Sequence, residues 1–432
     1  MDTQYVAQQA RQAAIRMAAL DAETKNNALA EIVAALEAEK AAIIAANQDD
    51  LAQAETEGLA APLLKRLRFD ESKIMEACAG LLSLMQLPDP VGVTLSATEL
   101  DQELELYKVS RPIGVIGVIF ESRPDALVQI SSLCLKSGNA VMLKGGSEAA
   151  RTNRLLAETI TAATSRSGLP DGWLGLLETR AAVTDMLALD QHIDLIIPRG
   201  SNAFVRHIME NTQIPVLGHA DGICHVYIDR DAEPNMALRV AVDSKCQYVA
   251  VCNAAETLLV HAECAERILP DLKKSLEAQG VEIRGCDATR KIIDVLPADE
   301  QDWATEYLDL IVSVKVVSDL AAAVDHINHY GSGHTDVIVS ADRKRAVRFM
   351  DCVDSADVFW NASSRFADGY RFGLGAEVGI STNKIHARGP VGMEGLLIYQ
   401  WRLMGTGHVV ADYSGDNAKV FTHRKLKKIF GH

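Results

Sequence analysis

The sequence lacks any long apolar run and any basic leader that could carry it into or across a membrane. No stretch approaches the ~20 consecutive apolar residues of a transmembrane helix. The opening segment MDTQYVAQQARQAAIRMAAL has neither the basic n-region nor the continuous apolar core of a signal peptide. We therefore expect no membrane association and a cytoplasmic location.

Excess positive charge and metal-type cysteine spacing are also missing. The formal net charge of −15 at pH 7 argues against nucleic acid or an anionic membrane surface as the main partner. The eight cysteines follow no CxxC or Cys/His metal-site pattern, so in the cytoplasm we expect free thiols, most of them in the core, and no metal site. An anionic small molecule would need local basic groups to bind.

The 432 residues are enough for two domains and a smaller appendage. Residues 1–90 are rich in Ala, Glu and Lys, and apolar residues from Leu29 to Ile43 fall on one helical face. From Arg111 onward, short apolar runs such as IGVIGVIF, AVMLK and DLIIP alternate with helical patterns, and a second series (HVYID, ETLLVH, IVSVKVV, DVIVS) follows Cys224. This alternation predicts an α/β protein with two Rossmann-like domains built on parallel sheets.

Two polar segments do not fit either α/β domain. LSATELDQELELYKV, bounded by Pro and Gly, predicts a projecting hairpin, and the tail after Trp401 is suited to pairing with that hairpin or with another subunit. We expect a small β flap used for oligomerisation. The predicted division is a nucleotide-binding domain at 1–94 and 110–223, a catalytic domain at 224–400, and the flap at 95–109 and 401–432.

Two strand-to-helix junctions are suited to a nucleotide. LKGGSEAARTN places Lys144 at the end of an apolar strand and Ser147 at the start of a predicted helix, and IIPRGSNAF places Gly200 and Ser201 similarly. Helix N-terminal amides and a nearby ammonium can hold a phosphate or ribose hydroxyls. An ordinary glycine turn with a surface lysine is the alternative. No GxGxxG occurs, so the common Rossmann fingerprint is disfavoured.

Cys252 lies in CNAAE, between an apolar segment and the predicted strand ETLLVH. A thiol on a tight loop at a sheet edge is exposed enough to react, and neighbouring backbone amides can stabilise an oxyanion. The alternative is a buried structural cysteine, which is the commoner fate of a free thiol.

A set of ordered segments resembles one known family along essentially the whole chain. The segments are RPIGVIGVIFESRPD, LKGGSEA, SGLPDGW, PRGSNAF, CNAAETLLVH, HINHYGSGHTD and FGLGAEVGISTNKIHARGPVGMEGL. They are similar to the gamma-glutamyl phosphate reductases, or glutamate-5-semialdehyde dehydrogenases, of the aldehyde dehydrogenase superfamily. This resemblance implies an aldehyde dehydrogenase-like fold and NADPH-dependent reduction of L-glutamate 5-phosphate to L-glutamate 5-semialdehyde and phosphate, the second step of proline biosynthesis from glutamate.

The resemblance makes Cys252 the catalytic nucleophile, which forms a thioester. The amides of Cys252 and Asn253 become candidate oxyanion donors, and Ser122 takes the place of an oxyanion asparagine. Aldehyde-oxidising relatives carry a glutamate some thirty residues before the cysteine, where it activates water for thioester hydrolysis. Here the region reads PVLGHADGICHV and has no glutamate, as expected if the thioester is reduced rather than hydrolysed.

The resemblance also assigns cofactor and substrate contacts. Lys144 would hold the adenine ribose or its 2′-phosphate, Ser201 after Gly200 the pyrophosphate, and Glu306 the nicotinamide ribose. An uncharged Ser147 favours NADP over NAD, although the neighbouring Glu148 weakens that argument. Candidates for the substrate's charged groups are Arg123, His334, His386 and Arg388 for the anions, and Glu121 and Asp336 for the ammonium. Arg123 with Asp125 could instead be a local ion pair, and the segment around His334 a structural turn.

Two alternative functions are another enzyme of the same superfamily and a protein without catalytic activity. An aldehyde-oxidising dehydrogenase of the same superfamily lacks support because the deacylating glutamate is missing, and a catalytically silent scaffold would not need Cys252, Lys144, Ser201 and Glu306 together. We expect a free-standing reductase that forms a dimer or tetramer, with a separate glutamate 5-kinase as a possible partner.

Overall fold

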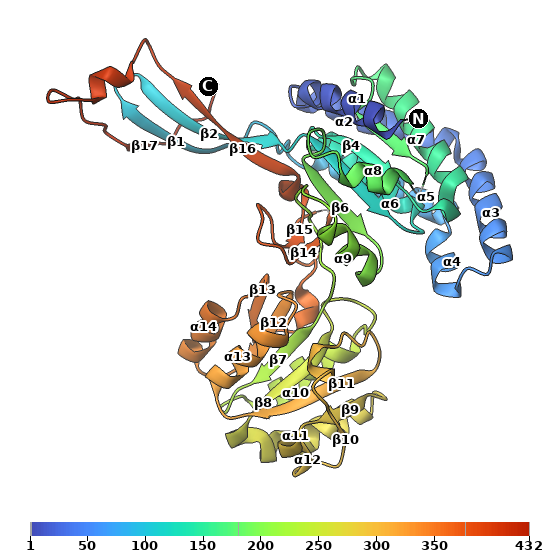
Figure 1. Ribbon diagram of the computed structural model, residues 1–432, viewed down its shortest axis with the longest axis vertical. Helices are drawn as coiled ribbons and strands as arrows, with labels where there is room; N and C mark the ends of the chain where they lie inside the picture. The colour runs from blue at the N-terminus through green and yellow to red at the C-terminus, as the bar shows by residue number, and fades with distance from the viewer. Residues whose placement is uncertain (1, 180, 376, 432) are drawn as a thin grey trace. The chain divides into compact units, whose positions relative to one another are not determined.

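The computed structural model describes residues 2–179, 181–375 and 377–431 (Figure 1). The chain forms two compact units. The first unit comprises Met1–Gly200, His207–Leu217 and Gly392–His432, and the second comprises Ser201–Arg206 and Gly218–Val391. Among the described residues, no helix is both long enough and apolar enough to span a bilayer.

Five helices begin the first unit: α1 (Thr3–Met17), α2 (Ala22–Ala38), α3 (Lys40–Thr56), α4 (Ala61–Leu67) and α5 (Glu71–Gln86). The Asp21 side chain caps α2 by accepting from the Thr24 amide at 2.8 Å. The apolar face expected between Leu29 and Ile43 is fully buried, and α2 packs against α5 and α7. The predicted helical layer is therefore present.

The sheet of the first unit has four parallel strands in the order β5-β4-β3-β6. Its elements are β3 (Val115–Phe120), α6 (Pro124–Lys136), β4 (Ala140–Lys144), η1 (Ser147–Ala149), α7 (Ala150–Arg166), β5 (Leu174–Leu177), α8 (Ala181–Leu187) and β6 (Leu195–Arg199), and α9 (Asn202–Glu210) follows them. The chain winds from β3 to β4 and β5 in one direction, whereas β6 pairs with the other side of β3. In open α/β sheets such a reversal marks the crevice where ligands bind, outside the carboxyl ends of the strands.

A four-stranded antiparallel flap in the order β16-β2-β1-β17 completes the first unit. It consists of β1 (Thr94–Asp101), β2 (Leu104–Pro112), β16 (Leu397–Met404) and β17 (Arg424–Leu426), with η4 (Met393–Leu396) and η5 (Val410–Tyr413) beside them. The hairpin and the tail therefore pair with each other, as the sequence suggested. Tyr399, Trp401 and Leu403 on β16 are each at least half exposed.

The second unit has a seven-stranded, fully parallel sheet in the order β10-β9-β11-β8-β7-β12-β13. Its strands are β7 (Cys224–Ile228), β8 (Ala255–His261), β9 (Glu282–Gly285), β10 (Leu296–Pro297), β11 (Ile311–Val317), β12 (Thr335–Val339) and β13 (Asp357–Trp360). The helices are α10 (Pro234–Cys246), α11 (Ala262–Glu277), α12 (Asp287–Arg290), η2 (Asp302–Ala304), α13 (Leu320–Tyr330), α14 (Arg343–Cys352) and η3 (Ser364–Phe366). A short pair, β14 (Gly379–Ser381) and β15 (Gly389–Val391), lies outside this sheet.

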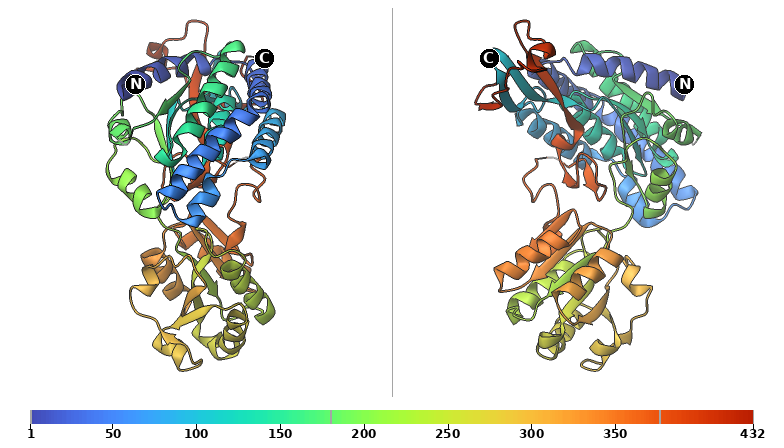
Figure 2. Two further views of the ribbon diagram at one scale, coloured as in Figure 1. Left: turned by 90° about the vertical axis from the view of Figure 1, so that its right-hand side faces the viewer. Right: turned by 60° about the vertical axis from the view of Figure 1, so that its left-hand side comes forward.

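Alternate residues of the central strands enter two separate cores. Val226 and Ile228 of β7 pack with α10 and α11, whereas Tyr227 between them packs with α13 and α14. Figure 2 shows these two helix layers on opposite faces of the sheet. A sheet covered on both faces favours strands with nearly continuous apolar runs, which explains VYI in β7 and LLV in β8.

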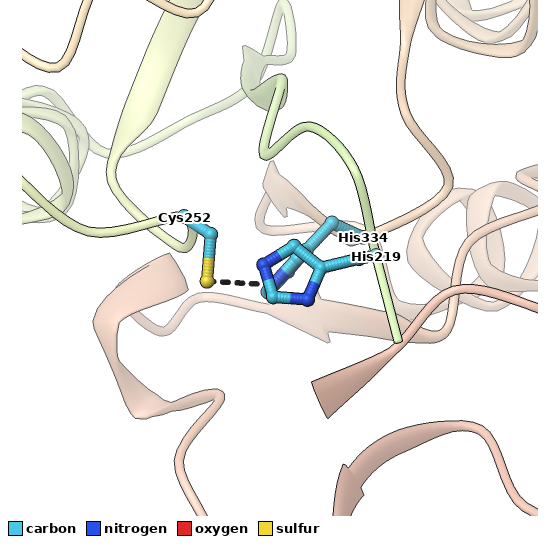
Figure 3. Close-up of side chains that lie close together, drawn as sticks. All are labelled: His219, Cys252 and His334. Carbon is cyan, nitrogen blue, oxygen red and sulfur yellow. Dashed lines mark hydrogen bonds between the residues drawn. The ribbon is translucent and has the colours of Figure 1, made fainter. Parts of the chain in front are cut away.

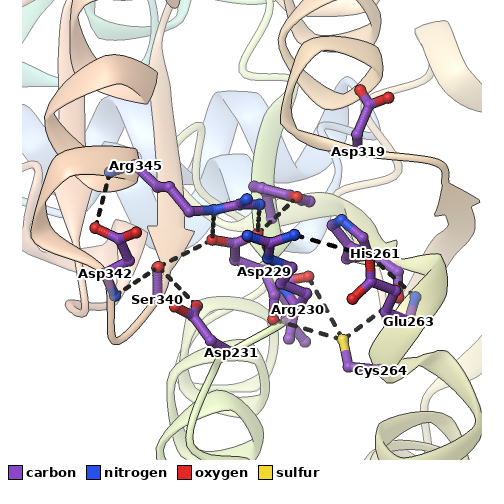
Figure 4. Close-up of polar contacts among 12 residues, drawn as sticks. Asp229, Arg230, Asp231, His261, Glu263, Cys264, Asp319, Ser340, Asp342 and Arg345 are labelled. Atoms are coloured by element: carbon purple, nitrogen blue, oxygen red, sulfur yellow. Dashed lines mark hydrogen bonds and ion pairs between the residues drawn. The ribbon is translucent and has the colours of Figure 1, made fainter.

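An ion pair between Asp229 and Arg345 lies at the carboxyl edge of the second sheet. Asp229 follows β7, and its carboxylate accepts hydrogen bonds from Arg345 Nε at 2.7 Å and Ser340 Oγ at 2.9 Å (Figure 4). Burial alone would raise the pKa of Asp229, but the Arg345 guanidinium, the Arg230 amide and the Ser340 hydroxyl together outweigh it and hold the pKa below its ordinary value. The chemistry-bearing residues of this unit lie at the opposite, amino edge.

Candidate active site

Parallel pairing brings the residues just before β7, β8 and β12 to one edge of the sheet. Cys224 pairs with Ala255, and Asp336 pairs with His225. Cys252 precedes β8 by three residues, and His334 immediately precedes β12. Segments that are about 80 residues apart in the chain therefore meet because their strands are neighbours of β7 in register.

Cys252 and His334 form the centre of this edge. Cys252 Sγ lies 3.1 Å from His334 Nε2, within hydrogen-bond distance (Figure 3). The Cys252 side chain is half-buried and His334 is fully buried. Burial, with His219 as a second contributor, lowers the pKa of the His334 imidazole to about 3. His334 is therefore neutral at physiological pH.

The other ring nitrogen of His334 is held by a hydroxyl and a carboxylate. His334 Nδ1 lies 2.7 Å from Thr335 Oγ1, and Thr335 Oγ1 donates to Asp357 Oδ2 at 3.4 Å. Since the Thr335 hydrogen points to the carboxylate, the hydroxyl oxygen accepts from a protonated Nδ1. This order leaves the Nε2 lone pair facing the sulfur, so a neutral imidazole can accept the thiol proton.

Three contacts fix the loop that carries Cys252. Cys224 Sγ donates to the Cys252 carbonyl at 3.2 Å, and Ser364 Oγ donates to the Asn253 carbonyl at 2.6 Å. The Asn253 side chain is buried and donates from Nδ2 to the Ala367 carbonyl at 2.7 Å. Asn253 thus supports the loop with its side chain, and any oxyanion role falls to backbone amides.

Gly222 packs against this loop without room for a side chain. A Cβ at Gly222 would lie 2.1 Å from the Cys252 carbonyl oxygen and 2.4 Å from its Cα. Both contacts are with backbone atoms, which cannot rotate away. Sequence reasoning missed this residue, and the available signal was a glycine three residues before His225, where the predicted strand HVYID begins.

Glu306 lies near the same loop. Its half-buried carboxylate accepts a hydrogen bond from Asn202 Nδ2. Burial raises the pKa of Glu306, although Asn202 and the backbone amide of Gly222 oppose the change. Because Gly222 also packs against Cys252, the Glu306 carboxylate lies close to the loop that carries Cys252.

A buried ion pair supports the segment that carries Glu306. Lys245 Nζ lies 2.6 Å from Glu256 Oε2, with both side chains fully buried, and Glu256 Oε1 accepts from the Leu308 amide at 3.3 Å. The pair therefore anchors the chain two residues beyond Glu306.

The predicted nucleotide residues of the first unit gather at the carboxyl edge of its sheet. Lys144 ends β4 and is 5% exposed, and its Nζ donates to the Gly145 carbonyl. Ser147 begins η1 just beyond it and is exposed, and Gly200 follows β6 and is also exposed. Ser201, exposed as well, precedes α9 and belongs to the second unit.

Ser122 and its neighbours follow β3 at the edge of the first sheet. Ser122 is buried, and its amide and Oγ both donate to Glu148 Oε1, at 2.6 and 2.7 Å. Arg123 pairs with Asp125 at 2.9 Å, which is the local ion pair considered above, and both side chains remain about one-third exposed. Glu121 is exposed, and its amide donates to the Arg199 carbonyl at 3.1 Å.

The remaining candidates differ in their surroundings. Asp336 is fully buried, and its oxygens accept from the His225 amide and from Ser355 Oγ, which favours a structural role. Arg388 is half-buried, pairs with Asp354 at 3.3 Å, and lines a polar pocket of about 390 Å³ that also includes Gly333, the residue before His334. His386 is exposed. Arg388 therefore lies close to the sheet edge that carries Cys252 and His334, whereas Asp336 is held by hydrogen bonds in the protein interior.

The fold and this edge define an α/β enzyme of the dehydrogenase type with a cysteine nucleophile. The model of the aldehyde dehydrogenase family matches residues 1–289. The chain is 61% identical to the gamma-glutamyl phosphate reductase of Pelotomaculum thermopropionicum, with 100% of this chain and 99% of that protein covered. It is 60% identical to the Acetivibrio thermocellus protein of the same name, with both chains covered in full.

A solved structure agrees with these sequence relatives. The crystal structure of the gamma-glutamyl phosphate reductase from Thermotoga maritima superposes with a TM-score of 0.92 at 37% identity, covering 95% of this chain and 100% of that one. The chain belongs to the aldehyde dehydrogenase family and, within it, to the gamma-glutamyl phosphate reductases. The family resemblance and fold class expected from the sequence are thereby confirmed, and the family implies a nicotinamide cofactor.

Proposed function

We propose that the protein reduces L-glutamate 5-phosphate to L-glutamate 5-semialdehyde and phosphate with NADPH, the second step of proline biosynthesis from glutamate. The observation that carries this proposal is the contact between Cys252 Sγ and His334 Nε2 at 3.1 Å, on a loop fixed by Gly222 and Ser364. We infer the substrate from the 61% identity, over the full length of the chain, to a gamma-glutamyl phosphate reductase.

In the first step, Cys252 attacks the acyl carbon of the substrate. The thiol proton moves to Nε2 of His334 as the sulfur forms its bond to carbon, and the carbon–oxygen bond to phosphate breaks. Phosphate leaves with the electron pair and takes a proton from solvent, so that a thioester remains on Cys252. Backbone amides of the Cys252 loop are the proposed donors to the oxyanion, because the nearby side chain of Asn253 is bound to Ala367.

In the second half of the reaction, reduction of the thioester gives a thiohemiacetal on Cys252. When bound, NADPH supplies the hydride for this reduction. The thiohemiacetal then collapses, the carbon–sulfur bond breaks, and the sulfur regains its proton from His334. The segment PVLGHADGICHV has no glutamate for a competing hydrolysis, and its carboxylate, Asp221, pairs with Arg206. The same segment carries His219, which lies near Cys252.

The residues present fit a nicotinamide nucleotide. Glu306 offers a half-buried carboxylate behind the Cys252 loop, which suits ribose hydroxyls there. Lys144 places a buried ammonium at the carboxyl edge of the first sheet, beside the exposed Ser147. We assign the nicotinamide ribose to Glu306, the adenine ribose or its 2′-phosphate to Lys144 and Ser147, and the pyrophosphate to Ser201 with Gly200.

Two features support NADP over NAD. Ser147 carries no charge that would repel a 2′-phosphate. The carboxylate of its neighbour Glu148 accepts both hydrogen bonds from Ser122, so it is directed back at the protein. We therefore propose NADP, rather than NAD, as the nucleotide.

For the substrate's charged groups we propose Arg388 first. Its guanidinium lines the pocket that includes Gly333, the residue before His334, and a substrate anion bound there would replace Asp354 as its partner. Arg123, Glu121 and His386 remain proposed contacts for the charged groups of the substrate.

Phosphate dependence tests the proposed reaction. In the oxidative direction, the thioester must be released by phosphate, so turnover of L-glutamate 5-semialdehyde with NADP should require inorganic phosphate or arsenate. The measurement is NADPH formation with and without phosphate in an otherwise phosphate-free buffer. Turnover at the same rate without phosphate would identify an aldehyde-oxidising dehydrogenase instead.

Replacement of Gly222 tests the geometry of the nucleophile loop. We expect Gly222→Ala to lower kcat/KM by about 100-fold or more, because a displacement near 1 Å at a reacting group costs that much. Gly80→Ala is the matched control, since a Cβ there would meet no atom within 4 Å. Equal kinetics for Gly222→Ala and the wild type would show that the loop tolerates the displacement.

The proposed function also includes self-association of the chain and a kinase that supplies the substrate. The exposed apolar side chains of β16 include Tyr399, Trp401 and Leu403, and an edge strand of this kind is suited to pairing with a second copy. We propose a homodimer or homotetramer. Because an acyl phosphate hydrolyses or cyclises readily, a glutamate 5-kinase is the proposed supplier of the substrate.

A further inference from the structure

Three side chains that could bind a metal ion lie close together around the Cys252 sulfur. His219, Cys252 and His334 each offer one ligand atom, and these atoms all lie within 4.8 Å of one another. Figure 3 shows both imidazole rings beside the sulfur. We propose that this cluster binds Zn²⁺ reversibly and that the bound ion holds the enzyme inactive. Sequence spacing did not indicate the site because its members precede different strands.

The donor set is one that zinc prefers. Thiolate sulfur and imidazole nitrogen are the common protein ligands of Zn²⁺, whereas Mg²⁺ and Ca²⁺ select oxygen. His219 Nδ1 lies 3.1 Å from the Ile380 carbonyl and His334 Nδ1 lies 2.7 Å from Thr335 Oγ1. With a proton on each Nδ1, the lone pair of each ring is on Nε2, the atom that would coordinate a metal. A ligating histidine whose other nitrogen donates to an oxygen is the usual arrangement.

The spacing requires only small side-chain rotations. In tetrahedral zinc sites with Zn–S near 2.3 Å and Zn–N near 2.0 Å, ligand atoms are separated by roughly 3.3–3.6 Å. The sulfur and His334 Nε2 are already 3.1 Å apart. Cys252 and His219 are half-buried rather than sealed, so an ion can reach them. Three protein ligands leave the fourth position to water.

Metal binding and catalysis compete for the same sulfur. Zn²⁺ forms a bond to the Cys252 sulfur and displaces the thiol proton to solvent, while the two neutral imidazoles contribute lone pairs and no electron is transferred. A coordinated sulfur cannot form an acyl bond. The metal site depends only on the three side chains, whereas the inhibition rests on the proposed function.

Co²⁺ is the spectroscopic probe for this site. Titration of the reduced, full-length protein with Co²⁺ should produce a near-ultraviolet thiolate-to-cobalt charge-transfer band that saturates at one equivalent and is displaced by Zn²⁺. Cys252→Ser should abolish the band, and His219→Ala should weaken Co²⁺ binding by about 10-fold or more. Cys286→Ser is the matched control. Burial raises the pKa of the Cys286 thiol, but hydrogen bonds from Thr289 and nearby amides outweigh it and lower the pKa, so Cys286 is a credible competing ligand.

The outcomes separate the metal site from the reaction. A one-equivalent band in a protein without reductase activity would support the site while removing the proposed function. Loss of reductase activity with Zn²⁺, restored by EDTA, would support both. The site is overturned if wild-type protein shows no band, if the band persists in Cys252→Ser, or if His219→Ala binds Co²⁺ as tightly as the wild type.

Discussion

Cys252→Ala is expected to lose reductase activity by about 10⁴-fold or more, the scale of loss when a covalent nucleophile is removed. The Cys252 thiol contacts His334 Nε2 at 3.1 Å, whereas the neighbouring Cys224 thiol donates to the Cys252 carbonyl. Nucleotide binding should persist, because Lys144 and Glu306 do not depend on the sulfur. The measurements are steady-state NADPH oxidation with L-glutamate 5-phosphate and a separate titration of NADPH fluorescence.

A second cysteine gives the control for that variant. Cys286 is half-buried and, despite its burial, has a thiol pKa lowered by contacts with Thr289, so it is a comparably accessible thiol. Cys286→Ala should retain wild-type kinetics. Mass spectrometry of wild-type protein mixed with the acyl phosphate in the absence of NADPH should find the acyl group on Cys252. Activity of Cys252→Ala within 10-fold of the wild type, or an adduct on another residue, would contradict the mechanism.

Much of the fold could be predicted because buried parallel strands leave a strong pattern. The runs IGVIGVIF and ETLLVH are rich in apolar residues, and the strands they form, β3 and β8, are buried at every position. The pairing of the hairpin with the tail was a weaker inference, based only on two polar segments without a core to join. The order of strands within each sheet was beyond prediction, because single runs carry no information about their neighbours.

The site was only partly predictable for the same reason. Cys252 and His334 were identified through family motifs, but the sequence placed His334 with the substrate's anions, whereas in the structure its Nε2 lies 3.1 Å from the Cys252 sulfur. Their proximity depends on the order β8-β7-β12. His219 and Gly222 were missed because a lone histidine and a lone glycine carry no pattern, and their importance follows from what lies next to them in space.

His334→Gln should separate a proton-accepting role from a structural one. We expect kcat to fall by about 10²- to 10⁴-fold, the usual contribution of a positioned general base, with a smaller change in KM. Glutamine can fill the buried site, but its amide cannot take the thiol proton, so alkylation of Cys252 by iodoacetamide should slow in parallel. Thr335→Val, which keeps the shape but removes the hydroxyl that accepts from His334 Nδ1, should give an intermediate loss.

Another buried histidine provides the comparison that decides between the two roles. His326 is also largely buried, and burial lowers its pKa to about 2, but it contacts Lys315 and neighbouring aromatic rings rather than Cys252. His326→Gln should therefore affect thermal stability while leaving the alkylation rate of Cys252 unchanged. If His334→Gln and His326→Gln lowered stability equally and neither changed the reactivity of the sulfur, His334 would be a packing residue. The 3.1 Å contact and the tautomer set by Thr335 and Asp357 favour the opposite result, because they direct the Nε2 lone pair at the atom that must lose its proton.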